Sequence, residues 1–203
     1  TMMHLLRGMD TLVENMPLSA VDESLVPMMA RAFDSGTPQL QEEALKKCAL
    51  LLDNMAFKLL KTEFLPRFHA MCLRTTSSAV RVGVLRAMAQ TVKRLDKEEA
   101  TKILDTLSKV TTVDKTPATI MNTLTVGKAV STQWGPDITA SRVLPLLCSL
   151  LNGSLNQQNF SALMKVIRDM LNEFEAKKAA TPEGASMAAS IRMAASPPGG
   201  GDT

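Results

Sequence analysis

Proline recurs in this chain at a spacing that strongly restricts the fold. Pro27 lies in the apolar run 25–29, Pro66 in the run 64–68 and Pro145 in the run 143–147. The first two prolines are 39 residues apart, and the third lies 79 residues further on, which corresponds to two more periods. The skipped position is Asp105, which lies in a similar apolar run without a proline. Four matching positions at one spacing predict an internal structural repeat of about forty residues.

The prolines also predict where helices begin. Proline lacks a backbone N–H and is tolerated in the first turn of a helix. Each apolar-apolar-proline motif is therefore expected to open a short helix. The expected caps are Asp22 or Ser24 for the first motif, Thr62 for the second, and Thr139 or Ser141 for the fourth.

A turn and a longer helix are expected after each short helix, the first of them over about residues 39–60. Apolar residues at three- and four-residue spacing predict the inward faces of these second helices. They are Leu45, Cys48, Ala49, Leu52, Met55 and Ala56; Val80, Val84, Leu85, Met88 and Val92; Ile120, Leu124, Gly127 and Val130; and Phe160, Leu163, Met164, Ile167, Met170 and Leu171. Composition agrees, because 14 Met, no Tyr and six Phe among many Leu and Ala favour helices over strands.

These patterns predict an all-α fold, an armadillo-like α-solenoid of HEAT-type helical hairpins. Residues 1–20, with a helix over 4–16, are expected to be the last helix of a truncated upstream repeat. Residues 21–178 are expected to form four hairpins, which bury their apolar faces by stacking. Residues 179–203, rich in Ala, Ser, Gly and Pro, are expected to be a flexible tail. No apolar stretch approaches the ~20 residues of a membrane span.

The sequence offers little for catalysis or metal binding, so we expect no enzyme activity, no cofactor and no metal. His69 and Cys72 are one helical turn apart, but two ligands without a third are a weak metal signal. Nothing in the sequence orients the imidazole for a Cys-His nucleophile. Acidic pairs such as Glu98-Glu99 are expected at helix starts, where they complement the helix dipole. The three cysteines sit in apolar runs, which predicts buried, reduced thiols.

Positive charge is concentrated in one repeat. Residues 1–57 carry a net charge of −4, residues 58–94 carry +7, and the remainder balances. The candidate binding patch consists of Arg67, Arg74, Arg81, Arg86, Lys93 and Arg94. A patch of this kind would serve an acidic peptide, an anionic lipid headgroup or RNA, and the alternative is an ordinary solvated face. Trp134 is expected to fill a gap between stacked hairpins rather than to contact a partner.

Four segments, taken in order, resemble a known family: residues 40–46, 65–82, 112–121 and 143–171. They are similar to the HEAT-repeat region of the SCY-like pseudokinases, especially the coated-vesicle-associated branch and its plant or algal members. The resemblance covers roughly residues 25–178. It implies a longer parent protein with an N-terminal kinase-like domain, usually inactive, and the start of this chain at Thr1 is consistent with a cut into such a protein.

The resemblance also implies a function. Members act in clathrin-linked vesicle traffic, so we expect a non-catalytic scaffold that contacts coat or adaptor proteins. Its expected location is cytoplasmic, peripheral to Golgi and endosomal membranes. The sequence shows no clear clathrin box, and residues 171–175 are only a near match to one. Two alternatives remain: an RNA-associated adaptor, since another branch is linked to transfer-RNA export, and a structural subunit that bridges a large assembly.

Overall fold

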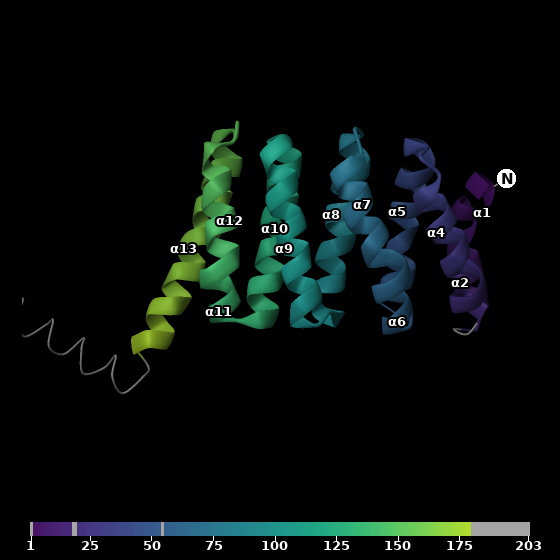
Figure 1. Cartoon of the computed structure of the whole chain (residues 1–203), viewed down its shortest axis with the longest axis horizontal. Helices are drawn as coiled ribbons and strands as arrows, with labels where there is room; N and C mark the ends of the chain where they lie inside the picture. Colours follow the sequence, from purple (N-terminus) through teal and green to yellow (C-terminus); the bar gives the residue numbers. More distant parts are fainter. Residues whose placement is uncertain (1, 18–19, 54, 180–203) are drawn as a thin grey trace, which may run out of the picture. The chain divides into compact units, whose positions relative to one another are not determined.

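The computed structural model describes residues 2–17, 20–53 and 55–179, and every regular element within them is helical (Figure 1). The first elements are α1 (Met2–Arg7), α2 (Met9–Asn15), η1 (Val21–Leu25), α4 (Val26–Asp34), α5 (Pro38–Leu52), α6 (Phe57–Leu59), η2 (Leu60–Phe64), α7 (Leu65–Arg74) and α8 (Ser78–Thr91). They are followed by η3 (Val92–Arg94), α9 (Lys97–Val113), α10 (Pro117–Trp134), α11 (Pro136–Ile138), η4 (Thr139–Val143), α12 (Leu144–Ser149), η5 (Leu150–Asn152) and α13 (Gln157–Ala179). The fold is all-α, as the sequence predicts.

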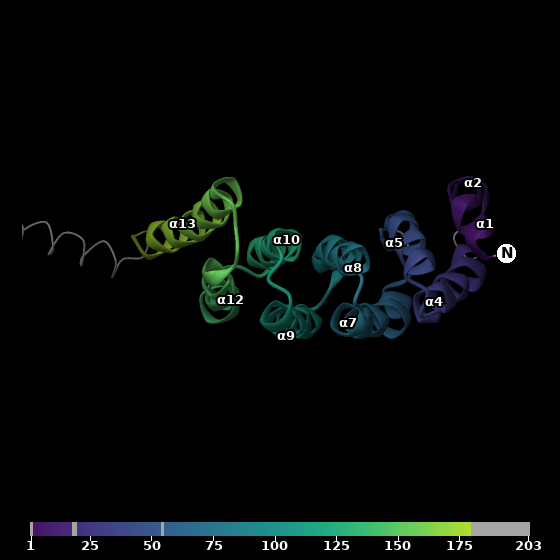
Figure 2. The same ribbon diagram turned by 90° about the horizontal axis from the view of Figure 1, so that it is seen from above.

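The chain divides into two compact units, Thr1–Leu163 and Met164–Thr203. In the first unit the helices form two layers (Figure 2): α4, α7, α9 and α12 lie along one side, and α5, α8 and α10 along the other. Each second helix packs against the next, α5 on α8 and α8 on α10, and α7 packs on α9 in the first-helix layer. This arrangement is the predicted α-solenoid of helical hairpins. In the second unit only the α13 residues up to Ala179 are described, so the expected tail lies almost wholly outside the described residues.

The prolines lie in the first turn of the segments α4, α7 and α12, but these segments continue a helix that begins before them, so the prediction that each proline motif opens a helix is wrong. Pro27, Pro66 and Pro145 each lie inside a longer helix, directly after a π-helical turn formed by η1, η2 or η4. In each case the residue before the proline donates its N–H to the carbonyl five residues earlier, as Leu65 does to Leu60. Proline lacks an N–H, and its ring clashes with the carbonyl four residues earlier in a regular α-helix. One widened turn removes that clash without ending the helix.

The repeat without the proline supports this explanation. Asp105 occupies the equivalent position, and α9 is an unbroken α-helix from Lys97 to Val113. Asp96 caps this helix, since its Oδ1 accepts the Glu99 N–H at 2.8 Å. The predicted caps lie instead within helical turns of their repeats, and none of the π turns has a side-chain cap.

Two helix boundaries differ from the prediction. The helix expected over 39–60 ends at Leu52, and the next helix already begins at Phe57, because the chain needs no proline to start it. The helix expected over 4–16 is divided at Gly8 into α1 and α2. Of the predicted inward residues, Ala49, Ala56 and Leu171 are exposed and Phe160 is 39% exposed.

The inward faces of α8 and α10 are predicted correctly. Every residue expected there is buried: Val80, Val84, Leu85, Met88, Val92, Ile120, Leu124, Gly127 and Val130. An aromatic cluster adds to the core between the first two repeats. Phe33, Phe64 and Phe68 meet edge to face, with ring centroids 5.4–5.9 Å apart. Such pairs contribute about 0.5–1.5 kcal/mol beyond their buried area.

Candidate functional site

The six residues of the predicted patch are divided between the two layers. Arg67 and Arg74 belong to α7, in the first-helix layer, whereas Arg81, Arg86, Lys93 and Arg94 belong to α8 and η3. The structure therefore does not bring the six side chains together on one face. Their contacts divide them further, into side chains that connect repeats and side chains exposed to solvent.

Arg81 is a buried connection between the second and third repeats. Its side chain is 11% exposed, and its Nη1 forms an ion pair with Asp114, whose side chain is 9% exposed. Its Nη2 also donates to the Thr75 carbonyl at 2.5 Å. All of its strong contacts are therefore made within the protein, and a guanidinium held in this way is a structural element.

Asp114 receives several donors besides Arg81. Its carboxylate accepts the Thr116 N–H at 2.9 Å and the Thr119 hydroxyl at 2.9 Å. Burial acts to raise the pKa of Asp114, but the hydrogen bonds from Thr116, Thr119 and Arg81 outweigh it and hold this pKa below its usual value. Asp114 is therefore held as a carboxylate in the turn between α9 and α10.

Arg94 and Arg67 also connect neighbouring repeats. Arg94 donates to the Leu52 carbonyl and, at 2.6 Å, to the Met55 carbonyl, so it supplies donors at the C-terminal end of α5. Arg67 pairs with Asp34 of the preceding repeat at 2.9 Å and with Glu63 at 2.9 Å. Three of the six predicted residues thus have structural contacts, and a binding role for them stays a prediction.

The other predicted cations are exposed. Arg74 is exposed at the end of α7. Arg86 is exposed on α8, and among the described residues its one side-chain hydrogen bond is long, 3.4 Å from its Nε to the Asn122 Oδ1. Lys93 is 63% exposed and pairs with Asp53 at 3.0 Å. Hydrogen bonding from Lys93 lowers the pKa of Asp53, so that carboxylate stays ionised beside the lysine.

The structure adds Lys128 to this surface, a residue that the charge count by segments missed. Lys128 is exposed on α10, and it makes no ion pair with any residue that the structure describes. It lines the same groove as Lys93. A signal was available in the sequence: residues 78–94 and 117–134 contain no Asp or Glu, so the helices that become α8 and α10 carry only positive charge.

Two shallow grooves run on either side of α8. The groove between α5 and α8 has a volume of about 450 Å³ and is lined by Glu42, Leu45, Lys46, Ala49, Ala79, Val82, Gly83, Arg86, Ala87 and Gln90. The groove between α8 and α10 also has about 450 Å³ and is lined by Ala89, Gln90, Val92, Lys93, Thr125, Lys128, Ala129, Thr132 and Gln133. Gln90 lines both. Small and aliphatic side chains thus make up much of both linings, together with the cations Lys46, Arg86, Lys93 and Lys128 and the carboxylate of Glu42.

Gly83 sets the depth of the first groove. A Cβ at this position would lie 3.0 Å from Leu45 Cδ1 and 3.2 Å from Leu45 Cβ, closer than an ordinary contact. The absence of a side chain lets α8 approach α5 at this point. The surface is therefore shaped by close helix packing as well as by its charges.

The side chains considered for chemistry are in structural environments. His69 Nδ1 lies 2.7 Å from the Thr106 hydroxyl oxygen, and burial lowers the pKa of His69. Burial also raises the pKa of the Cys72 thiol to about 12, which opposes the thiolate that a nucleophile or metal ligand requires. Within residues 2–17, 20–53 and 55–179, no group of three or more His, Cys, Asp or Glu side chains is placed to hold a metal ion.

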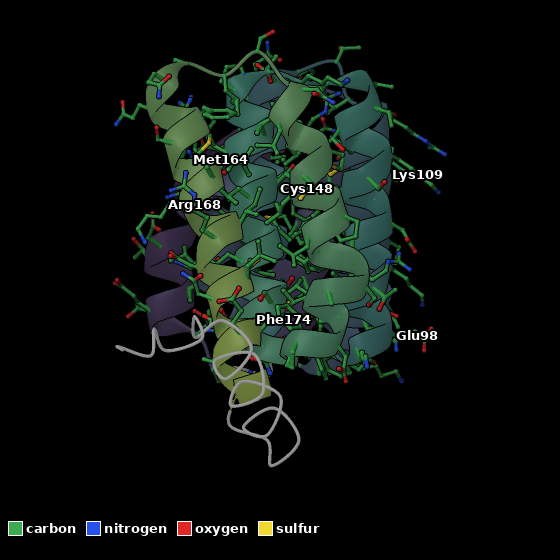
Figure 3. The ribbon with its side chains drawn as sticks, turned by 90° about the vertical axis from the view of Figure 1, so that its left-hand side faces the viewer. Glu98, Lys109, Cys148, Met164, Arg168 and Phe174 are labelled. Atoms are coloured by element: carbon green, nitrogen blue, oxygen red, sulfur yellow. The ribbon has the colours of Figure 1, made fainter. Side chains whose placement is uncertain are left out.

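The acidic pair at the start of α9 is in the predicted first turn. Glu98 contacts Lys102 at 2.7 Å, and hydrogen bonding from Lys102 lowers the pKa of Glu98. Figure 3 shows Glu98 and Lys109 of α9 pointing away from the neighbouring helices. A general acid at neutral pH needs a raised pKa, so this carboxylate has the opposite property.

Two other predicted features concern Trp134 and the membrane. Trp134 is half-buried at the last position of α10, where Gly135 ends the helix with φ +76°.

Of the helices in the described part of the chain, none combines the length and the apolar character that a bilayer crossing requires.

Comparisons with known proteins agree with the fold. No protein-family model matches the chain. SCY1-like protein 2 from Homo sapiens and from Mus musculus are each 32% identical to it over 178 residues, which cover 85% of this chain and 19% of the relative. The crystal structure of Cex1p superposes with a TM-score of 0.72 at 11% identity, over 87% of this chain and 33% of that one. At this identity the likeness to Cex1p establishes the fold alone.

Proposed function

The chain is a HEAT-type helical-repeat region of the SCY-like family, and on this premise we propose that it acts as a protein-binding scaffold in clathrin-linked vesicle traffic. It spans about a fifth of the length of the curated relatives it matches, 19% in each case. The described residues contain no catalytic domain, and the region itself has the architecture of a scaffold or adaptor. A kinase-like domain elsewhere in the parent, and a location at Golgi and endosomal membranes, are parts of the same proposal.

The observation that carries the proposal is the face formed by α5, α8 and α10. It presents two grooves lined largely by small and aliphatic side chains, and the exposed Arg86, Lys93 and Lys128 are among the residues that line them. In a helical solenoid the second helices present an extended surface that is suited to binding another macromolecule.

Binding to purified coat components tests the proposal. The chain of residues 1–203 is immobilised, and purified clathrin and purified adaptor complexes are passed over it in separate experiments. We expect at least one of them to be retained at physiological salt. The control is the same chain after heat denaturation. Retention of neither component, or equal retention by the denatured chain, would contradict a role as a coat or adaptor scaffold.

A second candidate function is RNA association, which is favoured by one observation. Residues 78–94 and 117–134 carry five Lys or Arg and no acidic residue. RNA held by about three exposed cations would show a salt dependence of about −2 in the slope of log K against log salt, since each phosphate contact contributes about −0.7 for single strands. A flat salt dependence, or no measurable binding to single-stranded or transfer RNA, would remove this candidate. Anionic lipid binding stays a prediction, tested with phosphatidylserine vesicles.

A further inference from the structure

The charges of α8, η3 and α10 divide into two that face inward and three that face solvent. Arg81 and Arg94 are engaged with Asp114 and with backbone carbonyls of the preceding repeat. Arg86, Lys93 and Lys128 are exposed. Because residues 78–94 and 117–134 contain no Asp or Glu, the inward pairing of two arginines does not cancel the charge of the outward three.

These three cations surround recessed surfaces that suit a polypeptide. Lys93 and Lys128 line the groove between α8 and α10, and Arg86 lines the groove on the other side of α8. Each groove has about 450 Å³, which is enough for a few side chains and too small for a whole helix of about 10 Å diameter. Arg86 and Lys93 are seven residues apart on one helical segment, or ~10 Å along its axis, which is about three residues of extended chain.

We infer that this face binds an acidic, extended segment of a partner protein, whose carboxylates pair with Arg86, Lys93 and Lys128 while small side chains enter the two grooves. The inference rests on the proposed scaffold function and specifies the chemistry of the partner. Charge complementarity requires the segment to be acidic, and the small volume of each groove requires it to be slender.

The same surface lacks the features that RNA and membranes use. Single-stranded nucleic acids stack their bases on aromatic side chains. The aromatic residue of α8 and α10 is Trp134 alone, and it is half-buried at the end of α10. Membrane surfaces attract clusters of four to eight Lys or Arg. Four cations line the two grooves here, but Lys46 is paired with Glu43 and Lys93 with Asp53, and Glu42 also lines the groove between α5 and α8. A peptide therefore matches the surface better than either alternative.

One carboxylate of the protein already occupies part of the surface. Asp53 pairs with Lys93 at 3.0 Å, and both side chains are largely exposed. An incoming acidic segment must displace Asp53 from Lys93 or bind beside it. This contact provides a further test, because removing the negative charge of Asp53 is expected to strengthen the binding of an acidic segment.

The experiment measures fluorescence anisotropy of a labelled peptide in which Asp and Glu alternate with Ala and Ser, titrated with the 1–203 chain. Reversing the three cations, R86E with K93E and K128E, is expected to weaken binding on the order of tenfold or more. The variant Asp53→Asn is expected to tighten binding about threefold, since the freed Lys93 becomes available. A matched control reverses three exposed lysines outside this face, Lys97, Lys109 and Lys115, and is expected to leave binding unchanged.

Several outcomes would overturn the inference. Equal binding by the triple variant and the unmodified chain would do so, as would equal weakening by the control reversal. Weaker peptide binding by Asp53→Asn would also contradict it, and this single exposed change keeps the test decisive if the triple variant loses its helical circular dichroism. Binding of single-stranded RNA or of phosphatidylserine vesicles, with no binding of the peptide, would assign the surface to that other ligand.

The failure of this inference is distinguishable from the failure of the proposed function. If the triple variant still retains clathrin or an adaptor complex, the scaffold function stands and this face is not its site. If the peptide binds as expected and neither coat component is retained, the face is confirmed and the clathrin-linked function is contradicted.

Discussion

Replacing Asp114 with Asn is expected to destabilise the first unit strongly. The substitution keeps the size of the side chain and the Oδ1 that accepts the Thr116 N–H. It replaces Oδ2, which accepts from the Thr119 hydroxyl and pairs with Arg81, by an amide NH₂ that cannot accept, and it removes the negative charge. Arg81 then remains in place with a side chain only 11% exposed and without a counter-charge. Breaking a buried ion pair from one side costs about 3–5 kcal/mol. The carbonyl of Thr75 still accepts from Arg81, so we expect a loss near the lower limit, about 3 kcal/mol.

The assay is urea unfolding followed by far-ultraviolet circular dichroism. Asp105→Asn is the matched control, because Asp105 pairs with Arg142 of the next repeat but both side chains are about half exposed, at 53% and 41%. An exposed pair contributes about 0–1 kcal/mol, so this control is expected to lose little stability. Equal losses for Asp114→Asn and Asp105→Asn would refute the conclusion that burial makes the Arg81–Asp114 pair important.

A double-mutant cycle and a pH series test the same pair independently. Arg81→Met combined with Asp114→Asn is expected to cost less than the sum of the single losses by about 1–3 kcal/mol. The pKa of Asp114 is lower in the folded protein than in the unfolded chain, where it is about 3.9. Its contribution to stability is therefore present above the unfolded pKa and is lost as the pH falls through the folded pKa. Asp114→Asn should reduce the acid sensitivity of unfolding over that window. Additive single losses together with an unchanged acid profile would contradict the coupling.

Three further predictions concern the helices, the core and the thiols. A proline in place of Asp105 is expected to lower the free energy of urea unfolding by about 3 kcal/mol or more, relative to Asp105→Ala, because α9 has no π turn to accept it. A loss below about 1 kcal/mol would show that a first helix without a π turn can also accommodate a proline. Phe68→Ala is expected to cost about 3–5 kcal/mol because it removes a fully buried ring from the aromatic cluster, and a loss like that of an exposed Phe57→Ala variant would contradict this. In the folded protein a maleimide is expected to modify the exposed Cys148, while burial raises the pKa values of Cys48 and Cys72 and protects both; mass spectrometry after digestion identifies the labelled thiols, and early labelling of a buried cysteine would refute this.

The repeat and the inward faces of its second helices could be predicted because both are local patterns. A helix turns every 3.6 residues wherever it lies, so the apolar positions of residues 80–92 and 120–130 show their buried face before any neighbour is known. The spacing of Pro27, Pro66 and Pro145 likewise requires only counting. The resemblance to the SCY-like family was visible for the same reason, since its segments follow in order along the chain.

The position of the prolines within their helices was not predictable from the proline rule alone. That rule compares a regular α-helix with a helix end and does not consider a widened turn. A π turn is rare and occurs mostly as a single widened turn inside an α-helix, so the usual rule for proline gives no reason to expect one. In the structure the helix through Pro66 is held by α8 and α9, and it continues past the proline.

Stacked helical hairpins and a concentration of positive charge in one repeat can both be inferred from the amino-acid sequence alone. Which of the cations are available to a partner depends on how the repeats pack against one another. Arg81 pairs with Asp114 of the following repeat, 33 residues away, and Arg94 donates to carbonyls of the preceding repeat, 39 and 42 residues away, whereas Arg86 of α8 faces solvent. Helical periodicity follows from the local geometry of one chain segment, but the partner of a long side chain depends on which neighbouring repeat packs beside it.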